Sequence, residues 1–446
     1  MIKRQRKKHR HITSFQVIIL GFLSMILLGS VLLMLPFATN DGKGAEFSDA
    51  LFTATSAVCV TGLITHDTAT YWSLFGQSVI LIMIQIGGMG IVTVAVAVAV
   101  FSGRKIGLMQ RSTMQEAVSA HHVGGIVRLT KFILKTTVCI ELAGAILLFP
   151  SFYRDFGIPK GIWYSVFHSV SAFCNAGFDL IGIKEQFSSL TSYSSDPLVN
   201  FTIISLIIIG GIGFLTWEDI KINKFRFRKY RLQSKVILSV TGILIIFPFL
   251  YFFFFEYSDY KLSERVLSSL FQSITPRTAG FNTTDLTAFS EAGQMLVISL
   301  MIIGGSPGST AGGMKTTTIA VLISSAFSVF KRNEHADLYK RRIPDEVVRN
   351  AATIFIMYVI LFIGCGTIIS RIESLPLMPC LFETASAIGT VGLSLGITPQ
   401  LGIISQLLLI ILMFFGRVGG LTLIFAATTV SGKKGSIYPQ EKITVG

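Results

Sequence analysis

The sequence predicts an all-α integral membrane protein in which four similar units surround one central pore. Composition is the first observation, since 51% of the 446 residues are hydrophobic and only 14% are charged. The second is a set of apolar runs long enough to cross the hydrocarbon core, which takes about 20 residues. The third is a short glycine loop that recurs four times at roughly even spacing. A soluble protein of this length could not keep its surface hydrated with so few charges.

Each glycine loop follows a short apolar segment and precedes a long one. In every copy the glycine comes third and an apolar residue follows it. The four loops are Val60, Thr61, Gly62; Asn175, Ala176, Gly177; Thr278, Ala279, Gly280; and Thr390, Val391, Gly392. Such repetition in an apolar chain indicates pseudo-fourfold symmetry.

Four tandem units follow from this repeat, each a long helix, a half-length helix, a glycine loop and a second long helix. Unit one covers 14–101, unit two with its cytoplasmic linker 102–217, unit three 218–330 and unit four 331–430, between an N-terminal segment 1–13 and a C-terminal tail 431–446. We expect long helices over 14–37, 74–101, 126–150, 197–217, 235–256, 293–330, 347–370 and 401–430. These would make eight transmembrane spans.

The half-length segments cover 48–59, 161–174, 264–276 and 377–389. They are too short to cross a bilayer, so we expect them to enter and return as re-entrant pore helices. Non-helical backbone at membrane depth is tolerated only where protein buries it or where it lines a water-filled cavity. The four loops should therefore meet around one aqueous path. Four amphipathic surface helices are the alternative, but these would not explain a glycine at nearly the same offset in every unit.

Charge is distributed in a pattern that fixes the expected topology. The formal net charge is +14, and the basic residues form blocks between spans, such as 221–231 and 331–342, whereas connections such as 41–49 are acidic. This is the positive-inside pattern, and it predicts that both termini are cytoplasmic. Because these basic blocks lie between hydrophobic spans, nucleic acid is not an expected partner.

The chemistry of the loops points to a cation. Rings of backbone carbonyl groups replace the hydration shell of a dehydrated ion in selective channels. Glycine permits the backbone angles that turn successive carbonyl groups inward. Thr390, Val391 and Gly392 match the TVG core of potassium-channel filters, and the other loops are degenerate versions of it.

Because of these four loops, the chain resembles the Trk/Ktr/HKT superfamily of potassium transporters, and most closely its KtrB-type membrane subunit. The resemblance implies potassium uptake across the bacterial plasma membrane, K⁺ as the substrate ion, Na⁺ as a coupling or activating ion, a homodimer in membrane lipid, and a cytoplasmic nucleotide-binding RCK ring of the KtrA type. Relatives with serine at the position of Gly62 tend to pass sodium, so Gly62 implies potassium selectivity. The third loop departs from the pattern, because one residue is missing where Pro276 and Arg277 stand.

A glycine-rich stretch interrupts the second long helix of unit three and is expected to gate the pore below the filter. Its residues are Gly304, Gly305, Ser306, Pro307, Gly308, Ser309, Thr310, Ala311, Gly312 and Gly313, followed by Lys315. In the other units the equivalent glycine patches are interpreted as close helix packing. Arg417 lies within the last apolar run, where a charge faces the bundle interior or a water path. The resemblance implies that Arg417 is a positive barrier in the pore.

Two other classes of protein remain in view. An alternating-access secondary transporter for sodium or another monovalent cation would carry inverted repeats, whereas all four units here share one orientation. A membrane enzyme would need a cluster of His, Asp or Ser and Lys residues, and none is evident. The five cysteines lack metal-site spacing. The residues leave open whether the pore is a simple channel or a coupled symporter.

Overall fold

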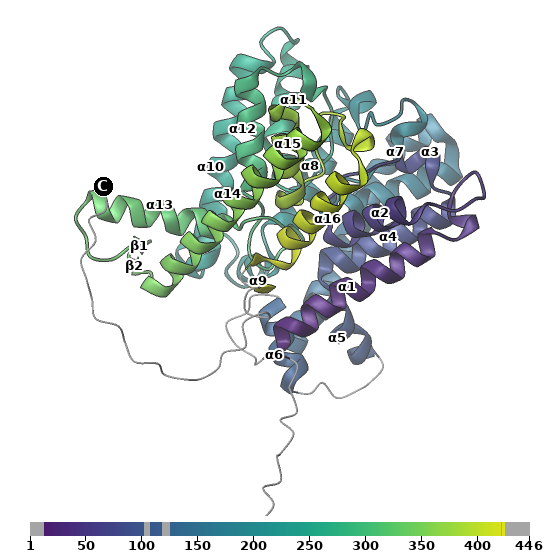
Figure 1. Ribbon diagram of the computed structural model, residues 1–446. Coiled ribbons are helices and arrows are strands. Elements are labelled where there is room, and N and C mark those ends of the chain that lie inside the picture. The colour runs from purple at the N-terminus through teal and green to yellow at the C-terminus, as the bar shows by residue number, and fades with distance from the viewer. Residues whose placement is uncertain (1–12, 102–107, 118–124, 421, 424–446) are drawn as a thin grey trace, which may run out of the picture.

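The computed structural model describes residues 13–101, 108–117, 125–420 and 422–423, and its chain is almost entirely helical (Figure 1). The basic N-terminal segment, apart from Thr13, and the C-terminal tail 431–446 lie outside the described residues. Thr13 begins the described chain with a capping box, in which its hydroxyl accepts from the Gln16 amide.

The helices follow the predicted order of long helix, short helix, loop and long helix. The first half contains α1 (Ser14–Leu33), α2 (Phe47–Cys59), α3 (Thr68–Tyr71), α4 (Leu74–Met89), α5 (Ile91–Phe101), α6 (Leu108–Ala117), α7 (Ile126–Phe173), α8 (Pro197–Gly211) and α9 (Phe214–Asn223). The second half contains α10 (Leu232–Tyr251), α11 (Leu262–Ile274), α12 (Glu291–Ile302), α13 (Thr316–Phe330), α14 (Asp345–Glu373), α15 (Leu377–Gly389) and α16 (Ile403–Val418). A small antiparallel hairpin, β1 (Asp337–Leu338) with β2 (Arg341–Arg342), joins α13 to α14.

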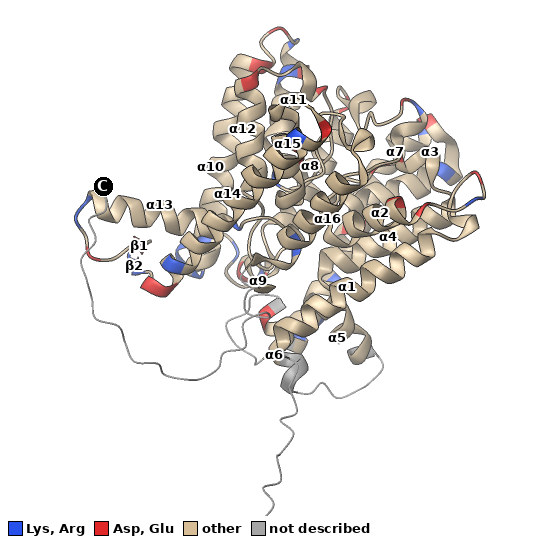
Figure 2. Ribbon diagram, in the orientation of Figure 1, with Lys and Arg blue, Asp and Glu red and all other residues tan. Residues whose placement is uncertain are grey.

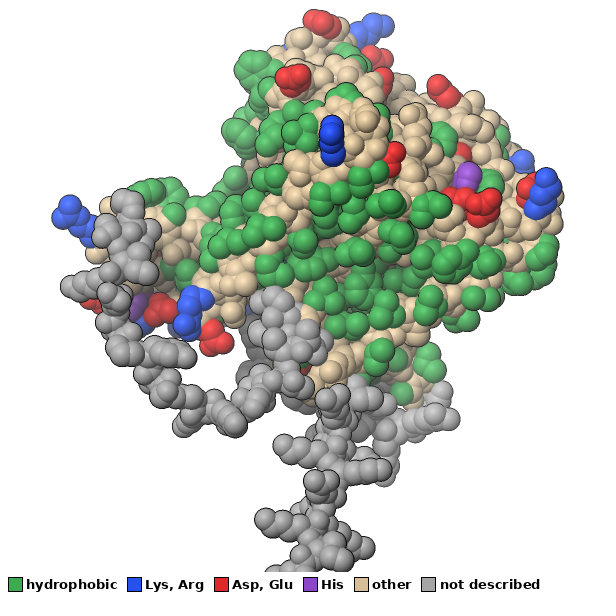
Figure 3. Space-filling model, in the orientation of Figure 1, with side chains coloured by type: hydrophobic (Ala, Val, Ile, Leu, Met, Phe, Trp, Pro, Cys, Tyr) green, Lys and Arg blue, Asp and Glu red, His purple; other side chains and the backbone are tan. Residues whose placement is uncertain are grey.

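Several helices are suited to a bilayer. By length and composition, α1, α7, Leu232–Glu256 and α14 could each cross a membrane, and the bent pairs α4–α5 and α8–α9 would raise the number to six in the described chain. On the face drawn in Figure 3, hydrophobic side chains cover the broad middle, while most charged side chains lie toward its margins. Figure 2 shows few charges along the helices themselves. The chain is a multi-pass membrane protein.

The expectation that only unit three breaks its second helix is wrong. The chain turns by 93° between α4 and α5 and by 96° between α8 and α9. Gly90 and Gly213 stand at these turns with φ of +85° and +93° and extended ψ. Residues that carry a Cβ atom rarely adopt this backbone conformation. Gly419 ends α16 in the same conformation. In units one, two and four, the glycine patch of the second long helix therefore also marks the point where that helix breaks or ends.

The packing interpretation holds for a second glycine in each of these patches. A Cβ on Gly87, Gly210 or Gly416 would clash with a carbonyl oxygen at the end of the pore helix in the same unit, that of Val58, Phe173 or Ile388 respectively. These glycines let the second long helix lie directly against the pore helix. The glycine at the break follows three residues later in each case, at Gly90, Gly213 and Gly419.

The predicted boundary between the first helix and the pore helix of unit two also needs correction. The first helix was expected to end at residue 150, but helical backbone continues past Pro150 and turns only at Gly157, where φ is +73° and ψ is −178°. Proline in a helix costs one backbone hydrogen bond without necessarily ending the helix. The glycine, rather than the proline, makes the turn toward the pore helix.

The breaks generate a stability prediction. Replacing Gly213 with Ala should lower the free energy of unfolding by about 1–3 kcal/mol, because alanine is strained at this backbone conformation and its Cβ would lie 2.7 Å from the carbonyl oxygen of Pro307. Gly242→Ala in α10 is the matched control. Nothing lies within 4 Å of a Cβ there, so helix propensity should make it neutral or slightly stabilising. Unfolding of both variants in detergent checks this, and equal stability would contradict it.

Candidate ion filter and gate

The four glycine loops share one backbone conformation. Each pore helix, namely α2, the C-terminal part of α7, α11 and α15, leads to a residue in the left-handed region: Val60 (φ +58°), Asn175 (+58°), Thr278 (+71°) and Thr390 (+51°). The glycine two positions later also has positive φ, from +69° at Gly177 to +94° at Gly392. Non-glycine residues rarely adopt such angles, so their recurrence at equivalent positions shows that the four loops are built alike.

The loops close into a ring in which every glycine abuts the next unit. A Cβ on Gly62 would clash with the carbonyl oxygen of Ala176, and one on Gly177 would lie 2.8 Å from that of Ala279. A Cβ on Gly280 would likewise clash with the carbonyl oxygen of Val391, and one on Gly392 with that of Thr61. Unit one therefore touches unit two, two touches three, three touches four, and four returns to one. Units one and three, and units two and four, lie diagonally opposite.

A hydroxyl residue on each pore helix anchors its loop, and this feature was not predicted. The backbone N–H of Thr61 donates to the carbonyl of Ser56 over 2.8 Å, and that of Gly62 donates to the Ser56 hydroxyl over 3.0 Å. Ser386 makes the matching pair of contacts in unit four. In unit two the Ser171 hydroxyl instead donates to the carbonyl of Phe178. In these three units a serine lies six residues before the loop glycine (Gly62, Gly177 or Gly392), and this spacing is the sequence signal that could have predicted the anchor.

Unit three is shortened in the way the sequence indicates. Thr275 stands five residues before Gly280, and its hydroxyl donates to the carbonyl of Phe281 over 2.6 Å. The amides of Ala279 and Gly280 both turn back to the carbonyl of Thr275. Arg277 is buried, with its guanidinium 3.4 Å from the Thr241 hydroxyl of α10. The missing residue therefore changes the approach to the loop while Gly280 keeps its place in the ring.

Several side-chain oxygens of the loops have no hydrogen-bond partner among the described residues. They include the hydroxyls of Thr61 and Thr390 and the side-chain oxygen of Asn175, all of which are buried. The Asn175 amide nitrogen donates to the Thr278 hydroxyl over 3.2 Å, which joins loops two and three sideways. Buried oxygens without donors are suited to a cation.

A vestibule of about 410 Å³ opens beside the ring. The four loop glycines line it together with the segments that follow them, including Asp179, Asn282 and Asp285. Burial, the largest cause, raises the pKa of Asp179 to about 7. Carboxyl groups at the mouth of a pore attract cations when they are ionised.

The glycine-rich stretch of unit three lies under the ring. The Thr310 hydroxyl donates to the carbonyl of Phe173 at the end of pore helix two, and the Phe214 amide donates to the carbonyl of Gly308 over 2.7 Å. On the other side, a Cβ on Gly312 would clash with the Thr390 side chain, and the Gly313 amide donates to Gly416. The loop therefore runs between units two and four.

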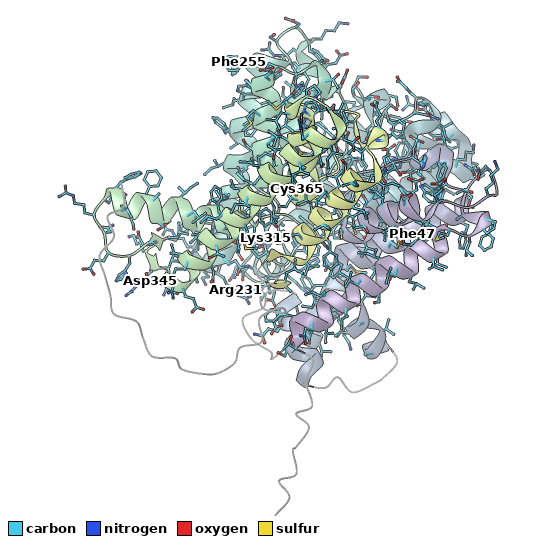
Figure 4. The ribbon with its side chains drawn as sticks, in the orientation of Figure 1. Phe47, Arg231, Phe255, Lys315, Asp345 and Cys365 are labelled. Atoms are coloured by element: carbon cyan, nitrogen blue, oxygen red, sulfur yellow. The ribbon has the colours of Figure 1, made fainter. Side chains whose placement is uncertain are left out.

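Two positively charged side chains, those of Lys315 and Arg417, donate hydrogen bonds to this loop. Lys315 is labelled near the middle of the view in Figure 4, and its Nζ donates to the carbonyls of Ala311 (2.9 Å) and Gly312 (3.1 Å). Arg417 donates through Nη1 to the carbonyl of Thr310 and through Nη2 to Gly87 and Gly88, the latter over 3.1 Å.

The contacts of Arg417 place it near the axis of the ring. It comes from unit four, yet it joins unit three at Thr310 to unit one at Gly87, and these two units are diagonal. Thr310 also contacts the carbonyl of Phe173 in unit two, so the guanidinium lies where residues of all four units meet. The structure thus brings together all four loops, the broken helix and both cations.

The ring, the vestibule and the bridged loop lie inside a multi-pass membrane protein, and the comparisons specify the family. Residues 2–435 match the TrkH family, described as a cation transport protein. The chain belongs to this family of cation transporters, which are not enzymes. This confirms the resemblance inferred from the loops.

Named relatives cover the chain almost completely. It is 40% identical to the potassium/sodium uptake protein NtpJ of Enterococcus hirae, over 100% of this chain and 99% of that protein. It is 38% identical to the Ktr system potassium uptake protein B of Bacillus subtilis, over 97% and 96% of the two chains. The crystal structure of the potassium transporter TrkH from Vibrio parahaemolyticus superposes with a TM-score of 0.75 at 20% identity, covering 96% of this chain and 87% of that one. The last likeness shows the shared fold.

The hydroxyl anchors generate a second stability prediction. Ser386→Ala should lower the free energy of unfolding by about 1–3 kcal/mol, because it leaves the Gly392 amide without its hydroxyl acceptor at a buried site. Ser24→Ala serves as the control, since the Ser24 hydroxyl on exposed α1 donates only to the carbonyl of Gly21 and its loss should change stability by less than about 0.5 kcal/mol. The free energies of unfolding of the two variants, measured under the same conditions, test this prediction. An equal loss of stability in both variants would argue against the anchor.

Proposed function

We propose that the chain is the ion-translocating subunit of a Ktr-like potassium uptake system. One observation carries the proposal: four loops of matching conformation close into a ring in which each glycine abuts a carbonyl group of the next unit. Such a ring supplies the fourfold set of backbone oxygens that a dehydrated cation requires. The relatives named for potassium uptake support potassium as the ion.

The full architecture is part of the proposal. In it, the four units contribute eight transmembrane spans around one central pore, with the second span of every unit broken at a glycine. The filter consists of Val60 to Gly62, Asn175 to Gly177, Thr278 to Gly280 and Thr390 to Gly392. The donor-free oxygens of Thr61, Thr390 and Asn175 support an ion at this depth.

Gating is proposed to occur at the loop from Gly304 to Gly313. Supporting this, the loop contacts units two and four directly below the filter, and Arg417 bridges it to unit one. A guanidinium near the axis opposes the passage of another cation. Moving the loop would require the carbonyls of Thr310 and Gly87 to part from Arg417, so the charge barrier and the loop would open together.

Setting and partners follow the family. We propose a bacterial plasma membrane protein with both termini cytoplasmic, working as a homodimer with a cytoplasmic nucleotide-binding RCK ring. The basic segments 221–231 and 331–342 fit both the cytoplasmic side and an acidic partner surface. Na⁺ is proposed as an activating or coupled ion. The Enterococcus hirae relative, named for potassium/sodium uptake, supports examining both ions.

Complementation tests the function directly. The chain should restore growth of a potassium-uptake-deficient bacterium at low external potassium, most strongly with an RCK partner and sodium present. The same strain expressing Gly392→Asp, which places a bulky carboxylate against the Thr61 carbonyl, is the negative control. Absence of rescue by a correctly inserted chain under every condition would refute potassium uptake.

Selectivity should depend on Gly62. Gly62→Ser is expected to raise the sodium share of uptake roughly threefold or more, because its side chain would displace the carbonyl of Ala176 and so distort two adjacent loops. Gly42→Ser is the matched control, as Gly42 also has positive φ but has open space at its Cβ. Sodium and potassium uptake, measured in parallel for each variant, test this expectation. Unchanged selectivity in Gly62→Ser would count against the filter assignment.

Turnover should depend on Arg417. Arg417→Gln is expected to pass potassium about tenfold faster, since ~1.4 kcal/mol removed from a barrier is a factor of ten in rate. Arg417→Lys keeps the charge but loses the planar fork that reaches two diagonal units, so it should stay closer to the parent rate. Potassium flux into proteoliposomes distinguishes them. No acceleration in Arg417→Gln would make this arginine a structural residue.

A further inference from the structure

A buried polar residue recurs on the pore helices, behind the filter. It stands three positions before the hydroxyl anchor in every unit, although its type differs: Thr53, His168, Gln272 and Glu383. All four are essentially inaccessible, with exposed fractions of 0% or 1%. A buried polar group in an apolar molecule needs partners, so what each one contacts is informative.

In unit two this residue ties the pore helix to the chain beyond the filter. The Leu180 amide donates to Nε2 of His168 over 3.3 Å, while Nδ1 lies 2.7 Å from the carbonyl of Tyr164. Because a backbone amide can only donate, Nε2 must be the acceptor and Nδ1 carries the proton. Leu180 lies three residues after Gly177. His168 therefore braces the outer end of filter loop two from behind.

Unit four makes the same connection with a carboxyl group and makes it twice. One oxygen of Glu383 accepts from the Ser394 hydroxyl, and the other accepts from the Thr398 hydroxyl over 2.8 Å. Ser394 in turn accepts from the Gly396 amide over 2.8 Å and lies 3.2 Å from the Thr398 hydroxyl. The segment from Ser394 to Thr398, which lines the vestibule, is thus fastened to the pore helix at two points.

Unit three is the contrast within the same molecule. Both polar atoms of the Gln272 side chain lack a hydrogen-bond partner in the part of the chain that the structure describes. The position is therefore polar in every unit, but a two-point brace is found only at Glu383 among the described contacts. It serves the loop that matches the TVG sequence most closely.

We infer that Glu383 is a positioning residue for the fourth filter loop and thereby helps to set the selectivity of the whole ring. The inference rests on the proposed function of the loops as a potassium filter. Its carboxyl group holds Ser394 and Thr398, which fixes where the chain leaves Gly392. Gly392 packs on the carbonyl of Thr61 and Gly280 packs on that of Val391, so a shift of loop four reaches units one and three. Selectivity, more than total flux, should suffer when the brace is lost.

The test compares initial rates of potassium and sodium uptake by purified protein in proteoliposomes. Glu383→Ala should lower the ratio of potassium to sodium uptake by about tenfold, the scale expected when two buried hydroxyls lose their acceptor. Glu383→Gln keeps one acceptor oxygen and should fall less. Gln272→Leu, at the matching position with no partner, should keep the parent ratio. Thermal unfolding confirms that each variant is folded.

A second pair of variants covers the case in which Glu383→Ala does not fold. Ser394→Ala and Thr398→Val each remove one donor while the carboxyl group stays, and each should lower the ratio by a smaller factor than Glu383→Ala, with the double variant lower than either. An unchanged ratio in folded Glu383→Ala, or in the folded double variant, would overturn the inference. An equal drop in Gln272→Leu would do the same. A parent protein that does not select potassium would instead refute the proposed function.

Discussion

Backbone that is neither helix nor sheet, placed deep inside an apolar molecule, is the constraint on which the rest of the structure depends. Each such N–H and C=O group must find a partner within the protein or face water or an ion. The four loops meet this demand by turning their amides back to Ser56, Ser386 and their counterparts. In the proposed filter, the loop carbonyls then serve the ion. Short helices, broken long helices and glycine patches all serve to bring these loops together.

The need to satisfy non-helical backbone also explains the two cations inside the molecule. The break between α12 and α13 exposes further carbonyl groups, and Lys315 and Arg417 donate to three of them, on Ala311, Gly312 and Thr310. Arg417 also donates to the carbonyls of Gly87 and Gly88 at the end of α4. Charges inside a membrane protein are costly unless such partners exist. Their placement therefore stabilises the loop under the filter and at the same time puts positive charge near the axis.

Much of this arrangement could be predicted from the residues, because its signals are local. A half-length apolar helix followed by Gly62 or Gly392 is visible in the sequence, as are the ten residues that interrupt unit three. The breaks at Gly90 and Gly213 were missed because glycine also packs helices, and Gly87 and Gly210 do that three residues earlier. The roles of Ser56 and Glu383 could not be predicted, since a single polar residue in an apolar run does not reveal its partner. The order of units around the ring depends on tertiary contacts that spacing alone does not contain.

The contacts between loop glycines and neighbouring carbonyl groups all point the same way around the ring, from one to two, two to three, three to four and four to one. Each quarter is therefore shaped by the backbone of its successor as much as by its own residues. A quarter exchanged between relatives would meet a neighbour that did not evolve with it on either side. A chimeric protein would therefore keep these contacts only where adjoining quarters were exchanged together.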